Sequence, residues 1–382
     1  MIKGPPVQHS HALLVVLALA LGAACGGRSV NVDRANPSDG TGGTTSVDRS
    51  PNTILTERIN QFWVDDTRLY WQTQEGSLQS CLQSDCSHST ISYGTTAGTF
   101  AVGRNDVYWV PRGLSQLLIY TCPKAGCSGN PTTVLHDPNG VPQTLSADGD
   151  YFYWSSAFDI YRCPVSGCGP TPEVVASGHT IGAPLTFEGD NAYWPIPETL
   201  AEAETGAAGA AGAAGNSGEP DGVLYAPKNG SAPVKVLRFP ADKESATGAN
   251  GGFSSYHSYA FDSQRVYWFD GSGRILSCPL EGCSETGAVQ LGSSSTNSRF
   301  MLSVDNAGLY WFEMMPFNNV AGICGNGGSL RFCTLDQCAA GESTVLADAV
   351  FAYALSDRDV YFTKQADDCN QGPIQRMPKP TQ

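Results

Sequence analysis

The chain has 382 residues, of which 41% are hydrophobic and only 15% are charged. This balance is typical of a folded all-β protein and excludes a disordered chain. With 36 acidic and 22 basic residues the net charge is −14, so we expect no nucleic-acid partner and no attraction to anionic membrane surfaces. The length allows two ordinary domains or one large repeat array.

Residues 1–24 are predicted to be a lipoprotein signal peptide. Lys3 supplies the positive start, residues 12–20 form an unbroken apolar run, and small residues precede Cys25. The order Leu-Gly-Ala-Ala-Cys resembles the lipobox of bacterial lipoproteins, whose cysteine is acylated, although Leu21 lies four residues before Cys25 instead of three. We expect Cys25 to carry lipid and to anchor the exported protein in the bacterial cell envelope, at the outer membrane. An ordinary signal peptide with a chance cysteine is the alternative.

Residues 25–51 are rich in Gly, Ser, Thr, Asn and Asp, which predicts a flexible tether. Residues 52–382 are predicted to fold as one repeat domain. A Tyr-Trp dipeptide recurs in them at intervals of roughly 45 residues with one long gap, which is typical of a repeat architecture. The copies are Tyr70-Trp71, Tyr108-Trp109, Tyr153-Trp154, Tyr193-Trp194, Tyr267-Trp268 and Tyr310-Trp311, with Tyr361-Phe362 as a variant.

Apolar residues recur one, six and eight positions before each of these tyrosines, as Leu69, Val64 and Phe62 do before Tyr70. The step of two between the last pair is strand spacing, and a short polar turn separates the apolar groups. The pattern predicts a hairpin of strand A, a tight turn and strand B, which ends in Tyr-Trp. The turn begins at Asp65, Gly103, Asp148, Glu188, Asp262, Asp305 or Ser356.

The motif Cys-Pro-x-x-Gly-Cys follows a short strand in three repeats, and two more cysteine pairs keep its spacing. Pro and Gly favour a tight turn, so the motif predicts a second hairpin, of strands C and D. Residues 226–231 of the fourth repeat lack both cysteines but keep the turn. Four strands in a unit of about 40–50 residues predict a propeller blade.

The seventh repeat stops after a strand C at residues 374–378, whereas residues 53–55 resemble a strand D that precedes the first strand A. We therefore predict an all-β, seven-bladed β-propeller of four-stranded blades, whose last blade is closed by the N-terminal strand. Closure leaves only protected sheet edges.

The cysteines of the C–D turns predict disulfides, because an exported protein matures in an oxidising compartment. Cys324 and Cys369 remain, in B–C loops of neighbouring blades, and we expect a bridge between them. Metal binding is the competing interpretation, but the cysteine pairs belong to different blades and would not converge on four ligands, so no metal site is predicted. The turn pairs are Cys81–Cys86, Cys122–Cys127, Cys163–Cys168, Cys278–Cys283 and Cys333–Cys338.

The irregular insertions all fall in B–C or D–A connections: residues 195–222, 239–257 and 314–328. A variable face on a rigid ring is where binding is expected, with neutral solvated insertions as the alternative. The acidic turn residues fit turn chemistry better than calcium binding, since Asp and Asn bond their own backbone. No catalytic motif, metal-binding His pair or phosphate loop stands out, so we expect no cofactor.

The Asp turn, the apolar residue before Tyr-Trp and the later Gly turn resemble the Tyr-Trp-Thr-Asp (YWTD) β-propeller of the low-density lipoprotein receptor class, over about residues 53–378. Thr-Asp is missing after every Tyr-Trp, and that family usually has six blades. The cysteine turns resemble those of bacterial lipoproteins with repeated Cys-Pro-x-x-Gly-Cys motifs. The resemblance implies a propeller and protein–protein contact, and it transfers no binding residues.

We therefore expect a binding or scaffold module that engages a protein or glycan through its variable loops. The alternative is a propeller enzyme, a hydrolase or lyase acting on carbohydrate, with a site near the central channel.

Overall fold

The computed structural model describes fourteen stretches of the chain. They are residues 51–95, 97–113, 117–137, 144–156, 159–168, 171–177, 185–195, 222–238, 259–269, 274–282, 288–293, 299–314, 328–365 and 371–380. Of the helices that they contain, none has the length and hydrophobicity needed to traverse a bilayer.

Five antiparallel sheets of four strands follow one another along the chain, each with its strands in sequence order. The first two consist of β2 (Ile59–Val64), β3 (Arg68–Thr73), β4 (Leu78–Leu82) and β5 (Ile91–Gly94), and of β6 (Ala97–Val102), β7 (Asp106–Pro111), β8 (Leu117–Pro123) and β9 (Thr132–Asp137). The third consists of β10 (Thr144–Asp148), β11 (Tyr151–Ser155), β12 (Asp159–Pro164) and β13 (Glu173–Ser177). The last two consist of β14 (Thr186–Glu188), β15 (Asn191–Pro195), β16 (Gly222–Pro227) and β17 (Lys235–Arg238), and of β18 (Tyr259–Phe261), β19 (Arg265–Phe269), β20 (Arg274–Pro279) and β21 (Val289–Ser293).

A sixth, seven-stranded sheet contains both ends of the described chain, in the order β1-β27-β26-β25-β24-β23-β22. Its strands are β22 (Arg299–Val304), β23 (Leu309–Met314), β24 (Gly328–Cys333), β25 (Thr344–Leu355), β26 (Asp359–Gln365), β27 (Gln371–Pro378) and β1 (Asn52–Leu55). The N-terminal strand β1 is antiparallel to β27, with Thr53 opposite Gln375.

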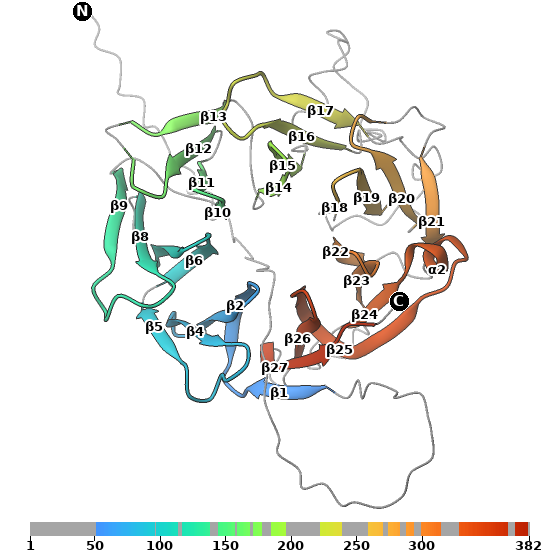
Figure 1. The fold of residues 1–382 in the computed structure, drawn as a ribbon, viewed down its shortest axis with the longest axis horizontal. Helices are drawn as coiled ribbons and strands as arrows, with labels where there is room; N and C mark the ends of the chain where they lie inside the picture. Colours follow the sequence, from blue (N-terminus) through green and yellow to red (C-terminus); the bar gives the residue numbers. More distant parts are fainter. Residues whose placement is uncertain are drawn as a thin grey trace, which may run out of the picture.

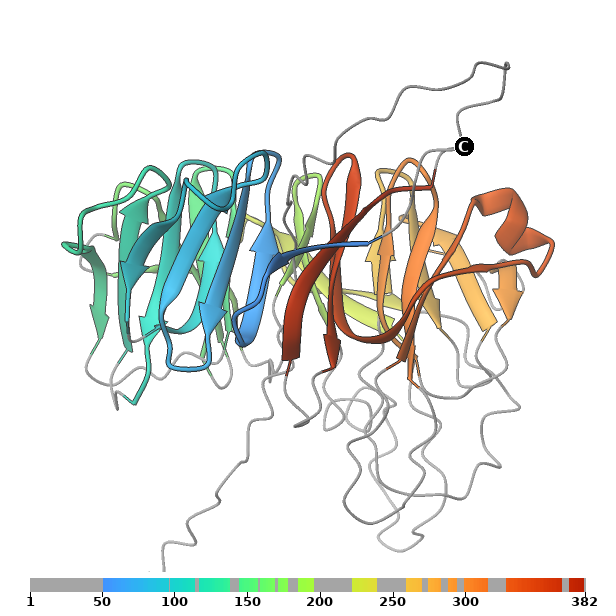
Figure 2. The same ribbon diagram turned by 90° about the horizontal axis from the view of Figure 1, so that it is seen from below.

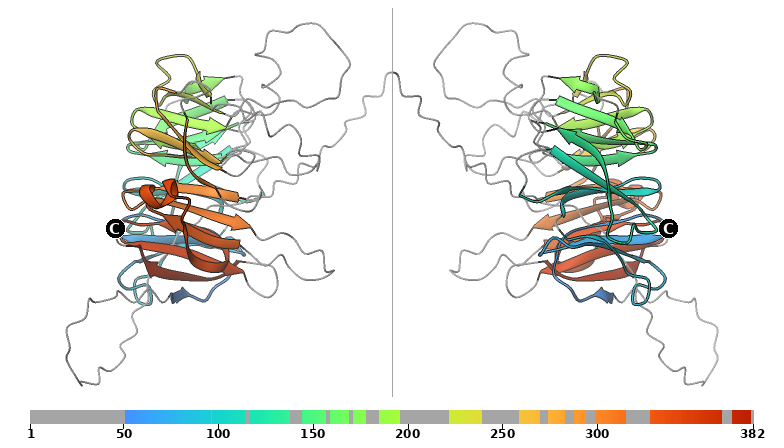
Figure 3. Two further views of the ribbon diagram at one scale, coloured as in Figure 1. Left: turned by 90° about the vertical axis from the view of Figure 1, so that its right-hand side faces the viewer. Right: turned by 90° about the vertical axis from the view of Figure 1, so that its left-hand side faces the viewer.

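The sheets stand radially around a common centre, with β2, β6, β10, β14, β18 and β22 innermost (Figure 1). Viewed from the side, they form a single layer whose innermost strands run roughly along the axis of the ring (Figures 2 and 3). Because consecutive strands are antiparallel, A–B and C–D connections lie at one end of each sheet and B–C and D–A connections at the other. We call these ends the turn face (for example residues 65–67 and 124–131) and the variable face (for example residues 74–77).

One register is repeated in every Tyr-Trp repeat. The residue before the tyrosine lies opposite the first cysteine position of strand C. The pairs are Leu69–Cys81, Val107–Cys122, Phe152–Cys163, Ala192–Ala226, Val266–Cys278, Leu309–Cys333 and Val360–Met377. Register in an antiparallel sheet decides which side chains share a face. The constant register therefore puts the same positions between neighbouring sheets each time.

The core lies between sheets. Among the described residues it divides into seven clusters, each built from two successive groups of strands. One cluster joins Phe62 and Trp71 of the first sheet to Tyr361 and Ile374 of the last strands, so the two ends of the repeat array pack together. Fully burying one large apolar side chain contributes roughly 1.5–3 kcal/mol, and each cluster contains several.

Two features differ from the sequence-based prediction. Instead of separate D and A strands, β25 is a single strand whose Val345 pairs with β24 and whose Ala352 pairs with β26. Between them Ala349 has φ 57°, in the left-handed region, so the strand bends as it passes from one set of partners to the next.

The second difference is a short helix, α2 (Leu335–Ala339), where a tight turn between two cysteines was expected. This segment, like residues 81–86, lacks the Pro and Gly of the other C–D turns. Thr334 instead caps the helix by accepting from the Gln337 amide, and the Gln337 side chain accepts from the Thr334 amide. This reciprocal capping box favours a helical start over a turn.

Candidate functional site

The Tyr-Trp pairs are structural. All thirteen tyrosine and tryptophan side chains of the seven copies, and Phe362, are at most 3% exposed. They pack between neighbouring sheets, as Tyr70 does with Phe100 and Trp109 of the next sheet. An aromatic pair in this position fixes the spacing of the sheets and is not accessible to a partner.

Asp65, the first residue of the first A–B turn, makes contacts in two directions. Its Oδ1 accepts from the amides of Thr67 (2.9 Å) and Arg68 (2.8 Å), which closes the turn, and its Oδ2 accepts from the Tyr70 hydroxyl (2.8 Å). The Lys124 ammonium, from the C–D turn of the next sheet, lies 2.6 Å from the same Oδ2. Burial raises the pKa of Asp65, but the hydrogen bonds from Lys124, the two amides and Tyr70 outweigh it, so the pKa is lowered.

This lysine–aspartate contact recurs. Lys228 pairs with Asp148, and Lys379 pairs with Asp305, each across the boundary between successive groups of strands. Each ammonium also lies near an aromatic ring: Lys124 is 5.8 Å from the Tyr70 ring centre, and Lys379 is 5.9 Å from that of Tyr310. Cation–π contact adds to the attraction at such distances. Where the turn residue is Gly103, the matching position of the next sheet is the apolar Val165.

The acidic turn residues therefore close turns and, in three cases, hold neighbouring sheets together. Within the described stretches no three His, Cys, Asp or Glu side chains gather as a possible metal site. Turn geometry and ion pairing account for Asp65, Asp148 and Asp305 without a bound ion.

Disulfides link the ends of four C–D connections. They join Cys81 to Cys86, Cys122 to Cys127, Cys163 to Cys168 and Cys333 to Cys338, with Cα separations of 4.8–5.6 Å. Cys278 is also disulfide-bonded. Its predicted partner Cys283 lies outside the described residues, as do Cys25, Cys324 and Cys369. The first cysteine of each pair is buried in the sheet, which indicates a structural role.

Buried polar side chains mark several strand ends at the variable face. Gln72, at the end of β3, is 1% exposed and donates to the Gly98 carbonyl (2.8 Å), while Arg112 donates to its Oε1 (3.2 Å). Glu313, near the end of β23, is also buried and pairs with Arg331. These positions immediately precede or flank variable connections, so they give those connections a rigid, hydrogen-bonded base.

Trp63 is the one tryptophan outside the Tyr-Trp pairs, and it is 47% exposed. It lies on the innermost strand β2, opposite Tyr70. At the aligned position the other repeats carry only small residues: Ala101, Ser146, Thr186, Ala260, Ser303 and Ala354. Its distinct position could have been recognised in the sequence from that alignment.

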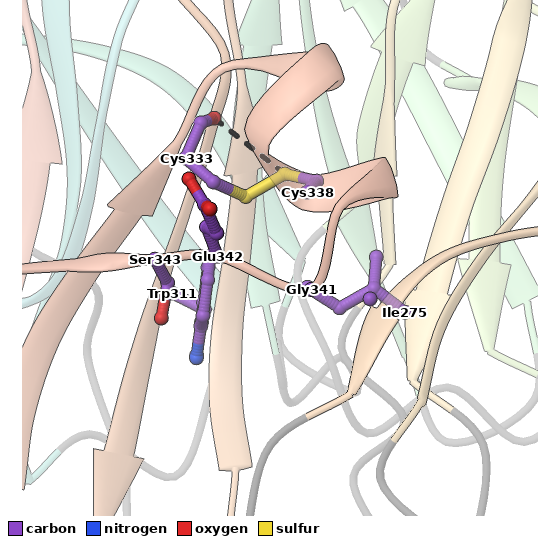
Figure 4. A pocket seen from close by; sticks show the side chains of 8 residues that line it. Ile275, Trp311, Cys333, Cys338, Gly341, Glu342 and Ser343 are labelled. Atoms are coloured by element: carbon purple, nitrogen blue, oxygen red, sulfur yellow. Dashed lines mark hydrogen bonds between the residues drawn. A yellow bond between two sulfur atoms is a disulfide. The ribbon is translucent and has the colours of Figure 1, made fainter.

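A small cavity beside α2 is not a ligand pocket. It is lined by Trp311, Glu342 and the Cys333–Cys338 disulfide, among others, and has a volume of about 10 Å³ (Figure 4). This is close to the minimum that accommodates one water molecule and far below the size of an organic ligand site.

Of the three long connections in which binding was expected, residues 239–257 lie wholly outside the described residues, and residues 195–222 and 314–328 lie outside them except at their ends. What the structure describes is the frame that presents them. The first leaves after β15 and returns at β16, the second joins β17 to β18, and the third joins β23 to β24. All three therefore open on the variable face.

Radially arranged antiparallel sheets with buried inter-sheet clusters define a β-propeller, and solved structures agree. YCF48 bound to D1 peptide superposes with a TM-score of 0.53 at 10% identity, over 88% of this chain and 97% of that one. The tricorn protease superposes with a TM-score of 0.56 at 12% identity, over 88% of this chain but 34% of its own, so this chain spans about a third of it. Identities this low show the fold alone. Comparison with protein-family models and with curated proteins finds no match.

Proposed function

We propose that this chain is a lipid-anchored cell-envelope protein whose propeller binds a protein or glycan partner through the variable face. The observation that carries the proposal is the unequal length of the connections. The long ones, 196–221, 239–258 and 315–327, all leave from the variable face, whereas turn-face connections such as 149–150 and 189–190 are tight. Loops on a rigid scaffold are where binding residues concentrate. The likeness to YCF48, which was solved bound to a peptide, supports a peptide or protein partner.

The proposed propeller has seven blades of YWTD type, two of which make up the seven-stranded sheet. Three observations support this count. Seven core clusters alternate with the groups of strands around the ring. The bend at Ala349 divides β25 between two sets of partners. The Asp305–Lys379 pair lies within this sheet, whereas its two counterparts join separate sheets. In this arrangement β1 completes the last blade.

The proposed anchor is Cys25, after removal of residues 1–24, with residues 25–51 as the tether and residues 52–382 as the propeller. The geometry of β1 supports an orientation of the ring relative to the proposed anchor. Asn52 lies opposite Arg376, near the end of β27, so the chain enters the ring at the turn face. A tether that arrives there leaves the variable face free to meet a partner. We also propose the bridges Cys278–Cys283 and Cys324–Cys369.

Mass analysis of the mature protein tests the anchor: the N-terminal peptide should begin at an acylated Cys25. An unmodified N-terminus elsewhere contradicts it. Non-reducing peptide mapping tests the two proposed bridges, and any other partner for Cys324 or Cys369 contradicts the loop assignment.

Loop replacement tests the binding face. Residues 196–221 are exchanged for a four-residue B–C turn of the kind found at residues 74–77. The variant should keep the melting temperature of the parent and lose partners that the parent captures from envelope extract. The R104A/D150A variant, altered only in an exposed ion pair of the turn face, is the matched control and should capture the same partners. Equal capture by the loop variant contradicts the assignment of binding to this connection.

A further inference from the structure

Two A–B turns of the turn face have almost the same surroundings. Asp262 Oδ1 accepts from the amides of Gln264 and Arg265 (both 2.8 Å), as Asp65 Oδ1 accepts from those of Thr67 and Arg68. Asp262 Oδ2 accepts from the Tyr267 hydroxyl at 2.6 Å, as Asp65 Oδ2 accepts from that of Tyr70. The two sites thus share a closed turn and a carboxylate oriented by a tyrosine.

The arginine beside each carboxylate is also held in the same way. Arg68 Nε donates to Ser80 Oγ (3.0 Å), and Arg265 Nε donates to Ser277 Oγ (3.1 Å). In both sites the guanidinium is directed to this serine of strand C, and the structure describes no ion pair between it and the turn aspartate. The charge of the aspartate is therefore left for another cation.

The sites differ in one group. Asp65 receives the Lys124 ammonium, which comes from the second residue after the first cysteine of the next C–D turn. In the sheet that follows the one containing Asp262, the second residue after the first cysteine is Leu335, in the short helix α2. Within the described part of the chain, Asp262 has no lysine or arginine partner. Tyr267 is 1% exposed, whereas Asp262 lies at the surface of the turn face and is partly accessible.

The other repeats show that an ammonium belongs in this position. Asp148 receives Lys228 from the next C–D turn, and Asp305 receives Lys379, which follows the last strand C. Where Gly103 replaces the aspartate, Val165 replaces the lysine. At Glu188 the matching position of the next sheet is also a leucine, Leu280. In that repeat, however, Tyr193 makes no described hydrogen bond to Glu188. Asp262 is thus a carboxylate oriented by a tyrosine. Its equivalents in three other repeats bind a lysine ammonium, and Asp262 has no such partner among the described residues.

We propose that the partly exposed carboxylate of Asp262, which the buried Tyr267 orients from behind, is an open binding site for a lysine side chain of a protein partner, on the turn face and separate from the variable face. The same chain supplies the ligand chemistry three times, always as a lysine ammonium from the end of strand C of the next repeat. A net charge of −14 favours encounter with a basic partner. The exposed Leu335, 44% accessible at the aligned position, offers apolar surface of the kind that a lysine stem covers.

The direct test uses two small probes, Nα-acetyl-lysine methylamide and the same compound acetylated on Nζ. Binding to the full chain, labelled with 13C in its tyrosine rings, is followed through the Tyr267 signal. The lysine probe should shift this signal saturably, and the neutral probe should not. The D262N variant, which keeps the turn and removes the charge, should weaken binding by about fivefold, as expected for one ion pair.

Two further variants serve as matched controls. K124M removes the resident lysine of the equivalent site, so the Tyr70 signal should begin to respond to the lysine probe. L335K offers an internal ligand, and it should reduce the response of Tyr267 and raise the melting temperature. Equal binding by parent and D262N, or equal shifts with both probes, overturns the proposal. The expected weakening in D262N together with failure of K124M to open its site overturns the comparison of the two sites on which the proposal rests.

Discussion

The Lys124 ammonium lies 2.6 Å from the Asp65 carboxylate across the boundary between two sheets, and both side chains are about four-fifths buried. This contact connects residues 59 positions apart in the chain and is made again by Lys228 with Asp148 and by Lys379 with Asp305. It joins an A–B turn to the neighbouring C–D turn, so it fixes how one sheet stands against the next.

A double-mutant cycle of D65N and K124M should give a coupling of about 1 kcal/mol in the free energy of unfolding, because the pair is partly shielded from water. The measurement is urea unfolding of the parent, both single variants and the double variant. The Arg104–Asp150 pair, whose side chains are 63% and 67% exposed, is the matched control and should show a coupling near zero. Similar couplings for both pairs would contradict the interlocking role.

The contribution of the Asp65–Lys124 pair to the free energy of unfolding should depend on pH, in a direction set by the pKa of Asp65. The pKa of Asp65 is lowered from its ordinary value of 3.8, so its contribution to stability is present above that value and is lost as the pH falls through the lowered pKa. The stability deficit of D65N should therefore shrink on acidification. Unfolding curves measured from neutral pH down to the acid range check this, and a deficit independent of pH would count against it.

Buried and exposed tryptophans should respond very differently to truncation. Trp71 is 1% exposed and donates to Glu57 Oε2 (3.0 Å), so W71A should cost about 3–5 kcal/mol. W63A should cost less than about 0.5 kcal/mol, because the Trp63 side chain is half in solvent. Urea unfolding gives both values, and acrylamide quenching of the W63F variant should show that the most accessible fluorescence has been removed.

Removing one C–D disulfide should cost about 2 kcal/mol, since the closed loop is short. The C163S/C168S variant tests this, with the parent measured under reducing conditions as a comparison. Residues 226–231 keep the turn without cysteines, and Gly230 has a positive φ as Gly126 and Gly167 do. The A226C/S231C variant should therefore form a new bridge and gain stability, and free thiols in the oxidised protein would contradict this.

Alkaline pH should unfold the protein through its buried tyrosines. Burial raises the pKa of Tyr153 to about 12, so its folded form keeps the proton above the ordinary value of 10.0. Stability is then complete below pH 10 and falls as the pH rises toward 12. Tyrosinate absorbance and circular dichroism should change together in this range. Y153F should lose part of the pH dependence, and early ionisation without unfolding would contradict the buried placement.

The repeat and its strands could be predicted because the same short pattern occurs seven times, and agreement among copies outweighs the ambiguity of each. The register between strands B and C was not predicted, although the residue before each tyrosine and the first cysteine position are both apolar. Helix α2 could have been found from Thr334 and Gln337, which fit a capping box. The continuity of strands D and A in β25 could not have been predicted, because nothing in residues 344–355 distinguishes one bent strand from two strands in succession.

The lysine–aspartate contacts were missed for another reason. Lys124 and Asp65 belong to different repeats, and alignment within repeats compares equivalent positions instead of positions that meet in space. Comparing each turn residue with the C–D turn of the following repeat would have paired them. The binding residues themselves were out of reach, because they are expected in connections whose composition carries no repeated pattern.

Strand β25 also restricts where this array can be cut or rearranged. Exposed connections such as that at Gly113, whose glycine has no neighbouring side chain, are places where a chain can be opened or a segment inserted. The boundary at Ala349 offers no such place, because the residues on either side are hydrogen-bonded into successive ladders. The last two groups of strands therefore share one continuous strand, and we expect a circular permutant or a shortened array to fold only when it keeps them together.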